Sequence, residues 1–217
     1  MHFLFGMVCV ELDLGVEAYK ALKEAVRLEP GNAAINYAMG AVALHRRDAT
    51  EAVPFFRKYA ELVPGDPRGP LAVGIAWFKA GELAAARPEL ERAAASDTTA
   101  AAADYFLARI ARAENELDRA LGLVEKALAR EPGYADAWAE RGLIHFRRRE
   151  REEAEKDLRR CLELDPDNYF GNLTLLALYQ RGKDARQEAQ AARVKDLEAG
   201  RDLKEEEFRR VIRVQPE

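Results

Sequence analysis

The stretch ADAWAERGLIHFRRREREEAEKDLRRCLELDPDN, residues 135–168, holds the pattern that decides the fold. Gly142 stands in its first half, Ala154 and Leu158 stand four residues apart in its second half, and Pro166 lies near its end. Residues three or four apart share one face of a helix, and proline marks a helix boundary. Alternating small and large residues allow two helices to approach closely and interlock. The stretch therefore predicts two antiparallel helices and a turn.

The same pattern recurs along the chain at intervals of 34 residues. Prolines mark it in the fragments RLEPGN, ELVPGD, AREPGY and ELDPDN, as Pro30, Pro64, Pro132 and Pro166. The interval between Pro64 and Pro132 is 68 residues, twice the period. Its midpoint is Thr98, where one unit has kept its length but lost its proline. Such a fixed period indicates a repeat architecture. We place unit starts at residues 33, 67, 101, 135 and 169, after a partial unit at 1–32.

Small and large residues recur at fixed places within these units. The eighth place is almost always glycine, which costs roughly 1 kcal/mol against alanine inside a helix, so its return predicts close backbone packing there. The recurrent residues are Gly6, Gly40, Gly74, Ala108 and Gly142 at the eighth place, Ala18, Ala52, Ala86, Ala120 and Ala154 at the twentieth, and Leu22, Phe56, Leu90, Val124 and Leu158 at the twenty-fourth.

Composition agrees with an all-α fold and narrows the function. The 217 residues are 48% hydrophobic and 33% charged, and the β-branched residues that sheets favour are scarce. A net charge of −4 argues against a nucleic-acid partner, and the apolar run at residues 3–10 is too short for membrane insertion. Two cysteines cannot form a disulfide framework. We expect a cytoplasmic protein.

This pattern resembles the tetratricopeptide repeat (TPR) family, whose 34-residue unit is a helix-turn-helix with fixed small, aromatic and proline places. The unit at 135–168 is the closest match. The resemblance covers residues 1–182 and implies an all-α, right-handed superhelix (an α-solenoid) of antiparallel helix pairs. Residues 183–217 are expected to be a degenerate last unit with C-terminal capping helices.

The two ends of the chain depart from the pattern. Glu188 and Lys195 occupy places that should be small and apolar, and the following sequence is highly charged. We interpret it as a cap that tolerates water on its outer face, packed by a narrow stripe of Phe208, Val211 and Ile212. The alternative is a further repeat that has been cut away. Met1 falls in the middle of an expected helix, which suggests a segment of a longer protein.

Pro54 and Pro88 test the expected helix boundaries. They lie 34 residues apart, and we expect both in the first turn of the second helix of their units, where proline is tolerated.

The chain carries no catalytic motif, so we expect no enzyme, no metal site and no cofactor. It lacks a glycine-rich phosphate loop, GxSxG, HExxH and CxxC. None of the three histidines has a metal-ligand partner at suitable spacing. Cys9 and Cys161 fall on packing places, where a free cysteine serves as a small apolar residue.

The resemblance implies that the first helices line a concave groove that binds an extended peptide or a partner helix. The groove places are largely apolar and aromatic, which favours a hydrophobic or amphipathic ligand. Lysine and asparagine, which chaperone-tail clamps use, are missing at Tyr37, Ala41, Leu71 and Ile75. The candidate groove residues are Tyr37, Leu44, Leu71, Ile75, Phe78, Tyr105, Arg109, Arg112, Phe146 and Phe170.

Three arginines need explanation. Arg109 and Arg112, one helical turn apart, could meet an acidic side chain or a terminal carboxylate of the partner. Arg141 occupies a seventh place that is otherwise apolar, and it must reach solvent or find a carboxylate. We favour a long stem that lies over apolar surface.

We therefore expect a non-catalytic interaction scaffold, either a monomer or a weak homo-oligomer. Two alternatives remain: a self-assembling architectural module, and a regulatory segment of a larger protein whose active domain lies outside this chain.

Overall fold

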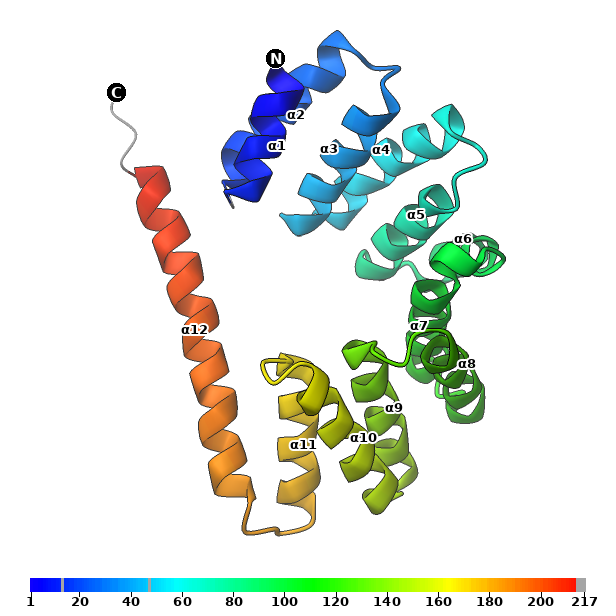
Figure 1. The fold of residues 1–217 in the computed structure, drawn as a ribbon, viewed down its shortest axis with the longest axis vertical. Coiled ribbons are helices and arrows are strands. Elements are labelled where there is room, and N and C mark those ends of the chain that lie inside the picture. Colours follow the sequence, from blue (N-terminus) through cyan, green and yellow to red (C-terminus); the bar gives the residue numbers. More distant parts are fainter. Residues whose placement is uncertain (13, 47, 214–217) are drawn as a thin grey trace. The chain divides into compact units, whose positions relative to one another are not determined.

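All regular secondary structure that the structure describes is α-helical, which confirms the expected fold class (Figure 1). The computed structural model describes residues 1–12, 14–46 and 48–213, with side chains described as far as residue 200. The chain divides into two compact units, Met1–Ile110 and Ala111–Glu217. The first holds α1 (His2–Glu11), α2 (Gly15–Leu28), α3 (Ala33–His45), α4 (Ala49–Leu62), α5 (Arg68–Lys79) and α6 (Leu83–Ala94). The second holds α8 (Leu117–Arg130), α9 (Ala135–Arg148), α10 (Arg151–Leu164), α11 (Tyr169–Arg181) and α12 (Gln187–Arg213), and α7 (Asp97–Ala113) crosses the division.

Each unit has its own core where helices of successive repeats meet. In the first unit, Cys9, Leu22 and Met39 are buried together between α1, α2 and α3. In the second, Leu158 of α10 and Leu175 of α11 are buried in one cluster. In these clusters the second helix of one repeat packs against the first helix of the next, so that one repeat covers its neighbour's apolar face.

The eighth-place glycines bring the two helices of one repeat into close approach. A Cβ atom built on Gly74 would lie 2.7 Å from Cγ of Leu90, and one built on Gly142 would lie 2.8 Å from Cγ of Leu158. Gly40 stands in the same relation to Phe56. The close packing predicted at the eighth place is confirmed, and its partner is the residue at the twenty-fourth place.

In the four repeats whose fifteenth place is described, the turn between the two helices has a left-handed residue at that place. Gly81, Asn115, Arg149 and Lys183 have φ values of 84°, 64°, 66° and 51°. Only glycine adopts this region without strain, so the other three turns store some backbone strain.

The expectation for Pro54 and Pro88 is wrong. Each is the sixth residue of its helix, because α4 begins at Ala49 and α6 begins at Leu83. Asp48 fixes the start of α4, since its side chain accepts a hydrogen bond from the backbone N–H of Glu51. Both prolines therefore remove one hydrogen bond from the second turn.

The unit that lacks its proline has a longer first helix. The helix α7 has 17 residues and begins at Asp97, one residue before Thr98, whereas the other first helices have 10 to 14 residues. Proline drives the preceding residue out of helical conformation, so its loss lets the helix begin earlier. The carboxylate of Asp97 in the first turn also favours the helix dipole.

Fourth-place side chains tie several repeats to the preceding turn. The side-chain amides of Asn36 and Asn172 donate to the carbonyl oxygens of Pro30 and Pro166, each over 3.0 Å. The indole N–H of Trp138 donates in the same way to the carbonyl of Pro132, over 2.8 Å. These bonds satisfy polar groups that the turn would otherwise leave open.

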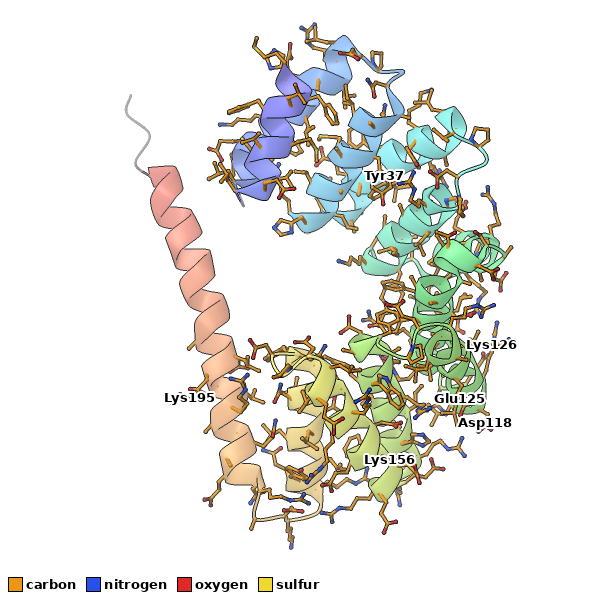
Figure 2. The ribbon with its side chains drawn as sticks, in the orientation of Figure 1. Tyr37, Asp118, Glu125, Lys126, Lys156 and Lys195 are labelled. Atoms are coloured by element: carbon orange, nitrogen blue, oxygen red, sulfur yellow. The ribbon has the colours of Figure 1, made fainter. Side chains whose placement is uncertain are left out.

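The last helix packs on α11 through its first half. Val194 is buried, and the side chain of Gln190 donates a 2.8 Å hydrogen bond to the side-chain oxygen of Asn172. Lys195, labelled in Figure 2, and Glu188 are exposed. The predicted stripe of Phe208, Val211 and Ile212 lies outside the residues whose side chains are described.

Candidate functional site

A cavity of the first unit lies against α1 and α3. Its volume is about 760 Å³. Phe3, Met7 and Val10 of α1 line it together with Tyr37 and Ala41 of α3. These residues belong to the fifth, ninth and twelfth places, because one helical face presents residues three and four apart. The cavity is therefore an apolar wall built from repeat positions.

A second cavity, of about 300 Å³, follows α3 and α5. It shares Tyr37, Ala41 and His45 with the first cavity. The structure thus brings together four of the predicted groove residues on neighbouring helices: Tyr37, Leu44, Leu71 and Ile75. We call the two cavities together the α1–α3–α5 groove.

Tyr37, labelled in Figure 2, lines both cavities, and its ring packs against other aromatic rings. Its ring packs edge-on against Tyr59, with 4.9 Å between centroids, and against Phe56, with 5.5 Å. Such pairs fix the ring and contribute about 0.5–1.5 kcal/mol beyond area burial. Tyr37 is thus a half-buried, preorganised apolar surface.

One end of the groove is polar, and the sequence analysis missed it. The hydroxyl of Tyr59 donates to Asp66, and Nε of Arg68 donates to the same carboxylate over 2.9 Å. The Arg68 guanidinium, together with the Tyr59 hydroxyl, holds the pKa of Asp66 well below its usual range. Burial, followed by the nearby Asp66 carboxylate, raises the pKa of Tyr59. An aspartate directly before Pro67 and a helix start is the signal that could have located this cluster.

Phe78, Tyr105 and Arg109 gather in a second aromatic cluster of the first unit. The guanidinium carbon of Arg109 lies 4.6 Å from the ring centroid of Phe78, 5.5 Å from Tyr105 and 5.7 Å from Phe106. Phe106 also packs edge-on against Phe78. Tyr105 is only 7% exposed, so it serves mainly as packing. Among the described residues, no carboxylate forms an ion pair with Arg109.

The predicted site residues of the second unit have other surroundings. Arg112 pairs with Glu140, whose side chain is 1% exposed, so this guanidinium is already engaged. Phe146 lies beneath Arg181, 5.4 Å from its guanidinium carbon, and lines a cavity of only about 160 Å³. Phe170 is exposed on α11.

Arg141 corrects our expectation of a stem lying over apolar surface. Its guanidinium makes two hydrogen bonds of 2.7 Å to the buried carboxylate of Asp157 and lies 4.5 Å from the ring centroid of Trp138. The hydrogen bonds to Asp157 raise the pKa of Arg141. The sequence signal that could have predicted this pair is Asp157, which directly precedes Leu158 in the second helix of the same repeat.

No group of three or more histidine, cysteine, aspartate or glutamate side chains is arranged to hold a metal ion in the part of the chain that the structure describes. Both cysteines are free and buried, and burial raises the pKa of Cys161 to about 12. None of the described helices combines the length and the hydrophobicity needed to span a bilayer.

Comparison with known proteins identifies the repeat. One tetratricopeptide repeat model matches residues 135–168, and a second matches residues 17–67 and 71–127. A search of curated protein sequences finds no match.

Solved structures agree with these matches. The MamA protein is 25% identical, with a TM-score of 0.62 over 76% of this chain and 91% of MamA. YrrB, described as a TPR protein with an unusual peptide-binding site, is 22% identical, with a TM-score of 0.57 over 78% of this chain and 88% of YrrB. The human IFIT1 dimer with PPP-AAAA is 16% identical, with a TM-score of 0.68 over 83% of this chain and 45% of IFIT1. The last two share the fold alone.

The period of 34 residues, the glycine contacts between paired helices and the family matches lead to one assignment. TPR arrays are protein-interaction scaffolds built on a generally non-catalytic fold. The chain belongs to the tetratricopeptide repeat family.

Proposed function

We propose that this protein is a non-catalytic scaffold that binds an extended peptide or helix of a partner protein in the α1–α3–α5 groove. The observation that carries the proposal is the cavity of about 760 Å³. Tyr37 lines both this cavity and the second cavity along α3 and α5. Its wall is mostly apolar, and the aromatic ring at its centre is already fixed by packing. A preorganised wall binds a ligand with little loss of its own entropy.

The charges beside the groove favour an amphipathic partner that carries carboxylates. Lys79 lines the second cavity, and the guanidinium of Arg109 lies over the ring of Phe78. Asp66, a carboxylate of the cavity wall, is engaged by Arg68 and Tyr59. A carboxylate on the partner would gain a charge-assisted hydrogen bond from an unpaired cation such as Arg109.

We favour a protein partner over a nucleic acid. RNA binding neutralises many phosphates and needs a cluster of cations along the bound strand. The net charge is −4, and the described residues that line the larger cavity include one arginine, already paired, and one histidine. The IFIT1 structure named above motivates a direct test with RNA.

We also propose that α12 caps the repeats, with residues 1–182 as the array and 183–217 as the terminal region. Its exposed Glu188 and Lys195 support this role, because a terminal helix must tolerate water on its outer face. We assign the protein to the cytoplasm, where a reducing environment suits its two free cysteines.

Peptide selection tests the proposal directly. A phage library of random 12-residue peptides is selected against the full chain, and recovered peptides are measured by fluorescence anisotropy. Ala41→Glu adds bulk and negative charge to an exposed position shared by both cavities. Ala84→Glu is the matched control, because Ala84 is exposed in the first turn of α6, outside the cavities.

We expect peptides that combine apolar and acidic residues, with binding weakened at least tenfold by Ala41→Glu and unchanged by Ala84→Glu. Each tenfold change corresponds to about 1.4 kcal/mol. Failure to enrich any peptide, or peptides that bind the Ala41→Glu variant equally well, would refute the groove. Tighter binding of a 5′-triphosphorylated oligoadenylate than of any peptide would favour a nucleic-acid function instead.

A further inference from the structure

Three faces of the helix α1 have different surroundings: one is buried, one lines the groove and one is exposed to solvent. Gly6 and Cys9 are buried, and Gly6 faces Leu22 of α2. Phe3, Met7 and Val10 line the groove. A third set of large apolar side chains faces solvent and is described here as the open face of α1: Met1, Leu4, Phe5, Val8 and Leu12.

Two positions of the open face, those of Phe5 and Val8, correspond to places that are mostly buried in the later repeats. Phe5 is at the seventh place and is 56% exposed, whereas Met39 and Val73 at the same place are 0% and 2% exposed. Val8 is at the tenth place and is 53% exposed, whereas its counterpart Ile144 is fully buried. In the later repeats these places receive the second helix of the preceding repeat. The open face therefore continues an interface that the fold already uses.

The same face carries no charge that would oppose another apolar helix. Between His2 and Glu11, the sequence FLFGMVCV contains no ionisable side chain apart from the buried Cys9. Contiguous exposed apolar residues of this kind usually mark an interaction site. An apolar, uncharged helix face is the partner that fits it.

The distribution of exposed apolar residues indicates which partner that is. The large hydrophobic side chains exposed in the described part of the chain are Met1, Leu4, Phe5, Val8, Val10, Leu12, Leu28, Phe170 and Leu173. Most of them belong to α1 or its caps. The best apolar cover for α1 that a second copy of the chain offers is therefore its own α1. A symmetric contact of this kind closes on itself and stops at two copies.

We propose that two copies of this protein form a two-fold dimer in which the open faces of α1 pack against each other. The contact lies on a different face of α1 from the groove residues Phe3 and Met7. Dimerisation and peptide binding can therefore be tested separately, and either can fail alone.

Analytical ultracentrifugation of the full chain over a wide range of concentration provides the test. We expect a monomer–dimer equilibrium whose dissociation constant rises at least tenfold when Phe5→Glu and Val8→Glu are combined, because each change acts twice in a symmetric interface. Leu173→Glu is the control, since Leu173 is an exposed apolar residue on α11. It should leave the equilibrium unchanged, and circular dichroism should show unchanged helix content for both variants.

Disulfide trapping tests the symmetry of the contact. Cysteine is placed singly at Leu4, Val8 or Leu12, and mild oxidation should link two identical chains in at least one variant, whereas Leu173→Cys should give no dimer. The native cysteines do not interfere because both are buried. A wild-type chain that stays monomeric, a dimer that survives the double change, or no crosslink at any α1 position would overturn the proposal. Loss of the dimer on Phe208→Glu with Ile212→Glu, with α1 crosslinks absent, would indicate a head-to-tail contact instead.

Discussion

The guanidinium of Arg141 and the carboxylate of Asp157 form a bidentate pair, with two hydrogen bonds of 2.7 Å, in the core of the repeat at 135–168. Asp157 is 1% exposed, and its partner takes the place of an apolar side chain. At that place the other repeats carry Met39, Val73, Leu107 and Leu175. One repeat therefore replaces an apolar contact with a buried ion pair.

Arg141→Leu restores the residue type of the other repeats and is nevertheless expected to destabilise the protein. It removes the bidentate partner of the buried Asp157 and leaves only the ring of His145, whose Nε2 lies 3.7 Å from that carboxylate. Breaking a buried pair typically costs about 3–5 kcal/mol. Urea denaturation followed by circular dichroism measures the change. The double variant Arg141→Leu with Asp157→Leu should recover most of the loss. A single variant as stable as the wild type would show that the pair contributes nothing.

Gly74→Ala should destabilise the protein although alanine is the better helix former. The new Cβ would lie 2.7 Å from Cγ of the fully buried Leu90, and overpacking costs about 1–3 kcal/mol against a propensity gain of about 1 kcal/mol. Gly122→Ala is the control, since nothing lies within 4 Å of its Cβ position inside α8, and it should stabilise by about 0.5–1 kcal/mol. Thermal melts of both variants give the comparison, and equal shifts in one direction would contradict it.

Arg149→Gly should stabilise the turn between α9 and α10. Arg149 has a φ of 66°, and left-handed backbone costs roughly 1–2 kcal/mol for a residue with a Cβ. The greater freedom of glycine in the unfolded chain offsets part of this gain, so we expect a net gain of about 0.5–1 kcal/mol. Lys183→Gly at the same place of the next repeat should behave alike. A loss of stability in chemical denaturation of both variants would argue against strain.

Asp66 should make the stability of the first unit depend on pH. Its pKa is lowered in the folded state by Arg68 and Tyr59, so the stabilisation is present above the unfolded value of about 3.9 and is lost as the pH falls below it. Asp66→Asn should therefore be less stable than the wild type at pH 7. The difference should shrink in denaturation curves measured at progressively lower pH below 4. A difference that does not change with pH would assign the effect to packing.

Arg109→Met should weaken the binding of acidic peptides to the groove. The substitution removes the charge and keeps an unbranched apolar stem beside Phe78, and a lost charge-assisted hydrogen bond of about 1.5–3 kcal/mol corresponds to at least a tenfold change. Arg109→Lys keeps the charge and should lose less. Anisotropy titrations at low and high salt measure both variants, and wild-type affinity in Arg109→Met would remove this residue from the site.

The repeated places of the chain could be predicted because each is fixed by contacts inside one repeat. Gly74 and Leu90 recur with the period, and the close packing at Gly74 follows from the return of glycine at one place of the repeat. The turn residue of each repeat, such as Asn115, recurs too, but asparagine, arginine and lysine share no obvious side-chain property. Only the backbone angle reveals what they have in common.

The site was harder to predict than the fold, because groove places and packing places lie on adjacent faces of the same helix. Tyr37 lines both cavities, whereas Tyr105, at the same place of another repeat, is buried. Arg112 pairs with Glu140, 28 residues further on, and no local pattern signals such a partner. The predicted starts of α4 and α6 were wrong because we assumed that proline occurs only in the first turn of a helix. A helix tolerates proline less well in its second turn, but proline is not excluded there.

The early start of α7 affects where a protease can cleave the chain. Only Ala95 and Ser96 separate α6 from α7, whereas four residues join α2 to α3 and α8 to α9. A protease needs several residues of exposed, extended backbone in its active site, and a two-residue joint cannot supply them without unwinding a helix. Limited digestion would therefore spare this joint and cut the proline-containing ones, leaving the α5–α8 segment as the resistant fragment.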